Sequence, residues 1–381
     1  MKKIIHFHFY THQNIGDAAV VYSIRDLLEK EFKISQYTSK PIFYLSDFDF
    51  GKFYIENLLN TNVIFKKLYS YNFFAKFLTS IMKFGKFIKG TYKKIRLVSL
   101  INKHDLMIVG GGGLYGKWTL PFDVSLINKV KIPIVIFGAG YNRTFADNKL
   151  SAKELNSIRV LNKKAKLCSV RDEKTLKIIK SLGIDASLTG DPAIFLESKK
   201  VNMRFDRKTK KIGLNIAYHD SQTKLYSEKV IKLYTKLIKN LEKNYKIHAY
   251  YLKHSSDEIY IAERLKELIP SIQVCEYGPR EMKYIYEKLD LVISMMLHSS
   301  IFAYSSGTNF INIAYNEKNY AFMRLINNMG NLIDMRKVDF NKLYSKCLKL
   351  LNNTNEANAM VKKDYFRKRI DEFVADIKMY I

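Results

Sequence analysis

The sequence has few cysteines and no long apolar run. Its 381 residues include three widely spaced cysteines, Cys168, Cys275 and Cys347, none in a C-x-x-C pattern. A disulfide framework and a zinc site are therefore not expected, and a reducing, cytoplasmic compartment is. No stretch of about 18 consecutive apolar residues occurs, so no transmembrane helix is predicted. The N-terminal MKKIIHFHFY is interrupted by His6 and His8, which indicates a first strand rather than a signal peptide.

Acidic residues are also scarce. Lysine and arginine number 64 against 36 aspartates and glutamates, which gives a formal charge of +28. Such an excess favours anionic partners, although charge alone says little about fold or chemistry. No acidic residue lies between Glu56 and Asp105. The basic segment, residues 66–104, instead combines lysines with apolar side chains at helical spacing, among them Phe73, Phe74, Phe77, Leu78, Ile81, Met82, Phe84 and Phe87.

Two interpretations of the basic segment remain open. A basic helix with aromatic residues opposite its charges is typical of elements that lie on an anionic membrane surface. A helix packed on the core with a solvated lysine face gives the same pattern. We expect an amphipathic insertion around 66–104, and a peripheral contact with the inner face of the cytoplasmic membrane is the functional interpretation.

Short apolar runs alternate with longer helical patterns through most of the chain, as is typical of parallel α/β domains. A polar stretch, ESKKVNMRFDRKTKK from Glu197, interrupts this alternation and is the best candidate for a domain boundary. We therefore expect an N-terminal domain over 1–200 and a C-terminal domain over 201–381. Strands are predicted at Ile4–Phe9, Val63–Phe65, Leu106–Val109, Ile134–Phe137 and Leu167–Val170, and at 211–218, 246–252, 272–277, 289–294 and 309–315.

A run of glycines follows the third predicted strand. Gly111, Gly113 and Gly116 satisfy the dinucleotide-binding pattern G-x-G-x-x-G. An NAD site also needs an acidic residue about 20 residues further on, at the end of the next strand. That strand ends in Gly138–Gly140, without an acid. We instead expect Gly111, Gly112 and Gly113 to bring bare backbone close to a different ligand.

The first loop also lies between a predicted strand and a predicted helix. Asn14 and Gly16 suit a tight turn, and Asp17 suits an N-cap. A helix N-terminus at this point offers backbone N–H groups to an anion or to a hydroxyl-rich ligand. Asp17 can also be explained as a simple cap of its helix.

Two further candidates follow strands of the first half. Arg171 comes directly after a buried strand, where an arginine can hold a phosphate or carboxylate through two hydrogen bonds. The alternative is a surface salt bridge with Asp172 or Glu173. Asp191 ends another strand, and holding a turn is the alternative to contact with a ligand.

His298 lies at a strand-to-helix junction in the second half, and Ser299 and Ser300 follow it as candidate helix caps. A histidine there is well placed for proton transfer, whereas a lone histidine is more often structural. Ligands of open α/β sheets bind beyond the carboxyl ends of the strands. Two facing domains would therefore bring His298 and the loops of the first half to one cleft.

Taken in order, these segments resemble the polysaccharide pyruvyl transferase family. The pieces cover most of the chain: NIGDAAV from Asn14, GGGG from Gly110, GAGYN from Gly138, SVRDEKT from Ser169, LTGDPA from Leu188, and LHSSIFA…G…FINIAYNEK from Leu297 to Lys318. The resemblance implies a GT-B-like fold, in which two Rossmann-type domains with parallel sheets face an interdomain cleft. It also implies transfer of the enolpyruvyl group of phosphoenolpyruvate to a sugar, closing a pyruvate ketal.

The resemblance further implies roles for individual residues. His298 would be the catalytic histidine and Arg171 an anion-binding residue, and the loops of Asn14–Asp17 and of the glycines would form parts of the cleft. Asp191, Ser299 and Lys318 complete the expected substrate-binding set. The implied partners are phosphoenolpyruvate and a glycan of a bacterial surface polysaccharide or its lipid-linked precursor, and the scheme requires no metal or cofactor.

One departure from the family pattern matters. The family commonly has Arg-Leu-His where this chain has Met296-Leu297-His298, so a guanidinium that would help to bind the donor is missing. The cations considered as replacements are Arg143, Arg280, Lys253 and Lys318.

Two other functions stay open. A GT-B glycosyltransferase that uses a nucleotide-activated sugar is favoured by Met296 and by the basic segment. A non-enzymatic binder of membrane or nucleic acid would use the charge alone. The sequence has no recognisable nucleic-acid module, so no nucleic-acid partner is expected.

Overall fold

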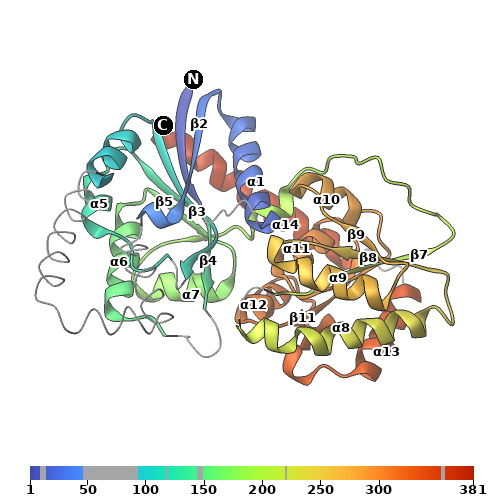
Figure 1. Ribbon diagram of the computed structural model, residues 1–381. Helices are drawn as coiled ribbons and strands as arrows, with labels where there is room; N and C mark the ends of the chain where they lie inside the picture. Colours follow the sequence, from blue (N-terminus) through green and yellow to red (C-terminus); the bar gives the residue numbers. More distant parts are fainter. Residues whose placement is uncertain (9–13, 46–92, 117–118, 144–148, 219–220, 353–356) are drawn as a thin grey trace, which may run out of the picture.

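The computed structural model describes residues 1–8, 14–45, 93–116, 119–143, 149–218, 221–352 and 357–381. These residues form two lobes, each built on a six-stranded parallel sheet that helices cover (Figure 1). The predicted α/β architecture of two Rossmann-type domains is thereby confirmed. Among the described helices, none combines the length and the apolar content needed to cross a bilayer.

The first sheet has the strand order β2-β1-β3-β4-β5-β6. The chain builds outward from β1 on one side and then returns to add β3 on the other, so a topological switch point lies between β1 and β3. The elements are β1 (Lys2–His8), α1 (Ile15–Glu31), β2 (Ile34–Pro41), β3 (Leu106–Gly116), α5 (Val124–Lys129), β4 (Ile134–Asn142), α6 (Ala152–Lys164), β5 (Leu167–Val170), α7 (Glu173–Ser181) and β6 (Ser187–Leu188), followed by the short 3₁₀ helix η2 (Pro192–Phe195).

The second sheet has the order β12-β11-β10-β7-β8-β9, which puts its switch point between β7 and β10. Its strands are β7 (Lys210–Leu214), β8 (Ile247–Leu252), β9 (Gln273–Cys275), β10 (Leu291–Ser294), β11 (Asn309–Ala314) and β12 (Leu332–Asp334). Its helices are α8 (Ser221–Leu241), α9 (Ile259–Leu268), α10 (Pro279–Tyr286), α11 (Leu297–Ser305), α12 (Glu317–Leu325) and α13 (Phe340–Asn352), and α14 (Ala357–Ile377) ends the chain.

Strand β3 is longer than predicted. The expected end at Val109 is wrong, because β3 continues to Gly116 beside β4, which itself continues to Asn142. Positive φ angles at Gly110–Gly112, which glycine adopts readily, accompany a register shift before Tyr115, so the glycines lie within the strand as a bulge.

Two sequence predictions concern residues outside the described part. The strand predicted at Val63–Phe65 and most of the basic segment lie there, so the described structure starts again at residue 93. Residues 93–101 are helical. The three cysteines all lie in the described part, where each is buried and unbridged.

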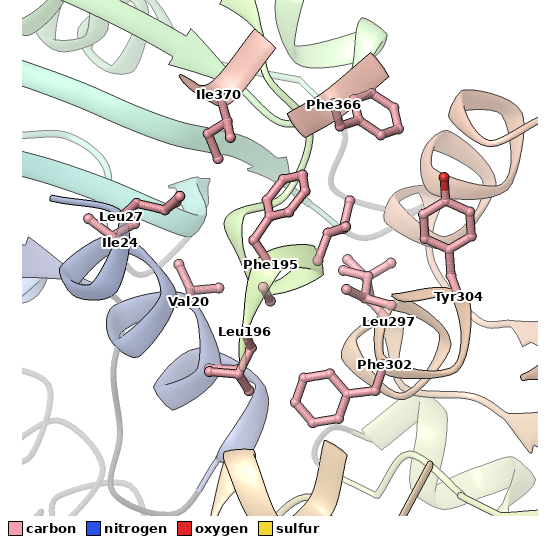
Figure 2. Packing of buried hydrophobic residues seen from close by; sticks show 14 of the residues in the cluster. Val20, Ile24, Leu27, Phe195, Leu196, Leu297, Phe302, Tyr304, Phe366 and Ile370 are labelled. Carbon is pink, nitrogen blue, oxygen red and sulfur yellow. The ribbon is translucent and has the colours of Figure 1, made fainter. Parts of the chain in front are cut away.

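One apolar core joins the two lobes (Figure 2). In Figure 2, side chains of α1 approach those of α11 and α14, and Phe195 of η2 lies between them. The labelled members are Val20, Ile24, Leu27, Phe195, Leu196, Leu297, Phe302, Tyr304, Phe366 and Ile370. Separate apolar cores lie on the other face of each sheet. Helix α14, red in Figure 1, contacts α1, β6 and α11, so the end of the chain packs on both lobes.

A buried lysine also connects the lobes. Lys283 of α10 is 5% exposed, and its Nζ donates hydrogen bonds to the carbonyl oxygens of Ile194, at 3.2 Å, and Leu196, at 2.6 Å. Burial, aided by the nearby charge of Lys363, lowers the pKa of Lys283 to about 7. The interior therefore favours the neutral amine, which still donates both hydrogen bonds.

Replacing Lys283 by methionine should destabilise the protein more at pH 9 than at pH 6. Methionine leaves two buried carbonyls without a donor, at about 1–3 kcal/mol each. The native lysine carries its own penalty, because its pKa of about 7 lies below that of an unfolded lysine. This penalty is complete below pH 7 and fades as the pH rises, so the substitution relieves it mainly at pH 6. Urea denaturation at both pH values measures the difference, and an equal loss at both would contradict this account.

Candidate active site

The N-terminus of α1 is capped by Asn14. The Asn14 Oδ1 atom accepts hydrogen bonds from the backbone N–H groups of Gly16, at 2.9 Å, and Asp17, at 3.3 Å. The predicted N-cap role of Asp17 is therefore wrong, because the helix begins two residues before it, at Ile15. Asp17 lies in the first turn of α1, where its carboxylate interacts with charged side chains of the site.

Gly16 allows α1 to lie directly against the second lobe. A Cβ atom at this position would overlap the imidazole of His298, the histidine at the start of α11. The preceding residue, Ile15, donates its N–H to the carbonyl oxygen of His254 at 3.0 Å. The start of α1, at the switch point of the first sheet, thus contacts His298 at the start of α11, near the switch point of the second sheet.

Asp191 connects His298 with Arg171. Its Oδ2 atom lies 3.7 Å from His298 Nε2 and 3.2 Å from Arg171 Nη1, and its Oδ1 atom accepts the Ala193 N–H at 3.0 Å. Burial would raise the pKa of Asp191, but the contact with His298 and the charges of His298 and Arg171 outweigh it and lower the pKa to about 2. An ionised carboxylate therefore faces the imidazole, where it can orient the ring and stabilise its protonated form.

Arg171 is not the surface residue of the alternative interpretation. It is 5% exposed, and its contact with Asp191 is shorter than the 3.7 Å between its Nε atom and Asp172 Oδ2. Gly140 makes room for it, since a Cβ atom there would overlap Arg171 Nε and lie 2.8 Å from the carbonyl oxygen of Gly112. The guanidinium therefore lies beside the bare backbone of β3 and β4.

The three glycines predicted to bind substrate differ in what they face. A Cβ atom at Gly112 would lie 3.7 Å from Asp17 Oδ1, which places this glycine in the site. At Gly111 a Cβ atom would overlap Val20 in the core, and at Gly113 it would lie 2.7 Å from Asn142 Nδ2. Gly111 and Gly113 therefore permit close packing of β3 with its neighbours.

Asp17 lies within reach of four charged or titratable side chains. Burial raises the pKa of Asp17 to about 6, against the opposing charges of His298, Lys318 and Arg171 and with the support of Asp191. A carboxyl group with this pKa exchanges its proton close to neutral pH, which is the range that suits a general acid or base.

Three helices of the two lobes begin at this site. Asp172 and Asn316 cap α7 and α12 with their side chains, whereas Met296 gives α11 no side-chain cap. Arg171 and Lys318, the latter in the first turn of α12, line a hollow of about 10 Å³ there together with Asp172 and Asp191, and we call it the cationic hollow after its two cations. Helix N-termini carry partial positive charge and unpaired N–H groups, which favour a phosphate or a carboxylate beside this hollow.

Of the four cations considered in place of the missing arginine, Lys318 lines the cationic hollow. The other three bind carboxylates elsewhere, Arg143 with Glu154, Arg280 with Asp26 and Lys253 with Glu276. Met296 itself is 7% exposed and packs in the core of the second lobe.

Ser299 and Ser300 do not cap α11, because this helix begins earlier, at Leu297. Both side chains are fully buried. The Ser299 hydroxyl is hydrogen-bonded to the Tyr286 hydroxyl at 2.5 Å, and the Ser300 hydroxyl to that of Ser294 at 2.6 Å. Ser299, which was predicted to bind substrate, therefore does not line the cationic hollow, because its hydroxyl is bonded to Tyr286 in the interior.

Sequence reasoning missed two residues of the second lobe. His254, directly beyond β8, is 1% exposed, and its Nε2 atom lies 2.8 Å from the Tyr286 hydroxyl. Burial and the charge of His298 lower the pKa of His254 to about 3, so this ring is neutral. Asn215, beyond β7, accepts the Met296 N–H at 2.9 Å and so holds the start of α11. The strand-end rule that located His298 points to both.

His6 forms a hydrogen bond with the glycine bulge of β3. Its Nε2 atom lies 2.9 Å from the Gly110 carbonyl oxygen, and its Nδ1 atom lies 2.7 Å from the Tyr37 hydroxyl. Burial lowers the pKa of His6 to about 4, so the neutral ring donates to Gly110 and accepts from Tyr37. This residue, too, was not predicted to have a role.

Comparison with known proteins gives a family match and several similar folds. A family model described as polysaccharide pyruvyl transferase matches residues 14–317. A search of curated proteins found no match.

Solved structures share the two-domain architecture at low sequence identity. The S. aureus MnaA–UDP co-structure is 15% identical with a TM-score of 0.58, and the match covers 94% of this chain and 90% of that one. UDP-GlcNAc 2-epimerase from Neisseria meningitidis bound to UDP-GlcNAc is 15% identical, with a TM-score of 0.58 and 100% of both chains covered. The glycosyltransferase SnogD from Streptomyces nogalater is 10% identical, with a TM-score of 0.53 and 100% of both chains covered. These similarities show the predicted GT-B-like fold.

Proposed function

Since this chain belongs to the polysaccharide pyruvyl transferase family, and is thus a transferase, we propose that it moves the pyruvyl group of phosphoenolpyruvate onto a sugar. The acceptor is part of a bacterial surface polysaccharide or of its lipid-linked precursor, and the product is a pyruvate ketal. The observation that carries the proposal is the contact between Gly16 and His298. It joins an imidazole, a carboxyl group that titrates near neutral pH and the cationic hollow in one site.

The cationic hollow supports binding of the donor. Phosphoenolpyruvate carries a phosphate and a carboxylate, and Arg171, Lys318 and the start of α11 offer donors to both. A guanidinium has five N–H groups, so the contact of Arg171 with Asp191 leaves donors for a ligand. Lys318 supplies positive charge near the place where Met296 replaces the arginine of the family.

The reaction balances with the groups at the site. C3 of phosphoenolpyruvate gains a proton and becomes a methyl group, C2 forms bonds to two sugar oxygens, and the bond from C2 to the phosphate oxygen breaks. Of the two hydroxyl protons, one ends on C3 and the other on phosphate. We assign these transfers to His298, beside the ionised Asp191, and to Asp17, whose pKa is about 6. No metal or cofactor is included in the scheme.

A glycosyltransferase that uses a nucleotide-activated sugar is the second candidate. Met296 in place of the family arginine favours it, and so do the UDP and UDP-GlcNAc in two of the similar structures. Lys318 and the starts of α11 and α12 would then hold a diphosphate.

Calorimetric titration of the full chain with phosphoenolpyruvate, and separately with UDP- and CMP-sugars, tests the two candidates against each other. We expect saturable binding of phosphoenolpyruvate. Saturable binding of a sugar nucleotide with none of phosphoenolpyruvate would replace the first proposal by the second. A mass shift of the surface glycan on deletion of the gene then shows whether a ketal or a sugar is lost.

Replacing Asp17 by asparagine should remove an ionisation near pH 6 from the pH profile of kcat/KM. Asparagine keeps the shape of the side chain but cannot exchange a proton, so we expect a loss of about 10²-fold or more. Rates measured between pH 5 and 9 check this, with the exposed Asp185→Asn as the matched control. An inflection near pH 6 that persists in Asp17→Asn would show that another group causes it.

We also propose that the basic segment docks the enzyme on the anionic inner face of the cytoplasmic membrane. Its described end supports this, since Lys93, Lys94 and Arg96 are exposed on the helical residues 93–101. Exposed lysines and arginines near such a surface contribute about 1 kcal/mol each.

Replacing Lys93 and Arg96 together by glutamine should weaken binding to anionic vesicles about 10-fold or more. Flotation with vesicles of phosphatidylglycerol and phosphatidylcholine measures the effect, and the pair Lys368→Gln and Arg369→Gln on α14 is the control. Equal recovery of the wild-type protein with neutral and anionic vesicles would contradict membrane docking.

A further inference from the structure

A second hollow, of about 360 Å³, lies between α1 and the second lobe. It shares no lining residue with the cationic hollow. Asn14, Ala18 and Tyr22 line it from α1, at the four-residue spacing of one helix face, and the loops after β8 and β9 complete it. Its volume lies within the range of ligand pockets, about 300–1,000 Å³. We call it the tyrosine hollow, after Tyr22 and Tyr277 in its wall.

The charged side chains that line the tyrosine hollow form one ion pair. Its lysine, Lys253, is paired with Glu276 at 2.5 Å, so the two formal charges cancel. The amide of Asn14 and the hydroxyls of Ser255 and Ser256 complete the polar lining. Paired charges, an amide and hydroxyls supply donors and acceptors for a neutral ligand rich in hydroxyl groups, and they do not select an anion.

Two aromatic rings are exposed at the same place. Tyr22 and Tyr277 are each 38% exposed, although tyrosine usually places its ring against other side chains. The guanidinium carbon of Arg280 lies 6.0 Å from the centre of the Tyr22 ring, and Asp26 in turn binds Arg280. An exposed, supported ring beside hydroxyls and amides offers an apolar face to the C–H side of a pyranose.

A buried atom of His254 lacks a partner in the described structure. His254 lines the tyrosine hollow, and its Nδ1 atom has no hydrogen-bond partner among the described residues. Its Nε2 atom is bonded to the Tyr286 hydroxyl, which is bonded to Ser299, the residue after His298. Nδ1 has almost no accessible surface, so what His254 contributes is a chain of hydrogen bonds from the wall of the tyrosine hollow to the residue after His298.

We propose that the tyrosine hollow binds a neutral pyranose of the acceptor glycan. This assignment rests on the proposed function, because it divides the site between the two substrates of that reaction. The donor anion binds beside the cationic hollow, and the acceptor approaches from the tyrosine hollow. The start of α1 connects the two hollows with His298. Asn14 lines the tyrosine hollow, Gly16 lies against the His298 imidazole, and Asp17 interacts electrostatically with Lys318 of the cationic hollow.

Saturation-transfer NMR on the full chain tests the proposal with methyl glycosides of glucose, galactose, mannose, N-acetylglucosamine and N-acetylmannosamine. We expect at least one glycoside to bind at millimolar concentration. Tyr277→Ala and Tyr22→Ala should each weaken it about fivefold. Tyr365→Ala, which removes an exposed tyrosine of α14, is the matched control and should bind as the wild type does.

Phosphoenolpyruvate binding, followed calorimetrically in the same variants, separates this proposal from the proposed function. Unchanged donor binding in Tyr277→Ala, with weaker glycoside binding, supports a separate acceptor subsite. No glycoside binding to the wild type, or equal binding to the Tyr277→Ala variant, overturns the subsite whatever the donor result. Glycoside binding without phosphoenolpyruvate binding keeps the subsite and rejects the donor.

Discussion

Replacing His298 by glutamine should reduce pyruvyl transfer about 10³-fold or more while the protein stays folded. Glutamine fills a similar volume and can form hydrogen bonds, but it cannot exchange a proton at neutral pH. General acid–base catalysis by one side chain typically contributes 10²–10⁴-fold. The His298 side chain is only 10% exposed, and its nearest carboxylate is the buried Asp191. Acceptor-dependent release of phosphate measures the rate, and circular dichroism the fold.

A second histidine and a second carboxylate sharpen this experiment. His248→Gln, on a ring that stacks on Tyr250 in β8, should leave the rate unchanged. Asp191 acts through His298, so Asp191→Asn should slow the wild-type enzyme but add little to His298→Gln, as coupled residues do. Full additivity of the two losses would show that Asp191 acts through Arg171 and not through His298. Near-normal activity of His298→Gln would remove the imidazole from the mechanism.

Replacing Gly16 by alanine is expected to have the second-largest effect. The new Cβ atom would overlap the imidazole of His298, so either the ring or the start of α1 must move. Misplacement of a catalytic group by about 1 Å can cost 10²-fold in rate, and we expect a loss of that order. Overpacking at such a contact also destabilises by about 1–3 kcal/mol.

Gly330→Ala is the control for this substitution. A Cβ atom there would meet nothing within 4 Å, so the rate and the urea midpoint should both stay at the wild-type level. If Gly16→Ala kept full activity, the observed contact between α1 and His298 would not be the catalytic arrangement.

The central strands could be predicted from the sequence, but two of the four edge strands in the described residues could not. The predicted strand Leu167–Val170 coincides with β5, because a buried strand reads as a short apolar run. The edge strands β2 and β12 were missed, whereas the edge strand β9 was predicted at 272–277 and a strand ending at Asp191 was expected where β6 lies. Strand β2 reads ISQYTSKP and β12 has three residues, so neither carries enough apolar sequence to be recognised.

The site was predictable where it depends on topology and not where it depends on packing. Parallel strands end at one edge of a sheet, and this rule located His298, Arg171 and Asp17, which the structure brings together. The sequence could not decide whether Asn14 or Asp17 caps α1, because both side chains suit an N-cap. Nor could it show that His254 lies near His298, since that proximity depends on how the segments after β8 and β10 pack within the second lobe.

The core that both lobes share limits how new specificities can arise in this chain. Helix α1, η2, α11 and α14 contribute to one apolar cluster, so each lobe alone would expose a face that the other covers. Large apolar interfaces behave as one interior and not as a joint between exchangeable modules. A chimera that joins the halves of two relatives at the link between the sheets would therefore disrupt this core. The disruption is avoided only if α1, η2 and α14 come from the same parent. Changes of acceptor are instead expected to accumulate as point substitutions in loops, such as those after β8 and β9.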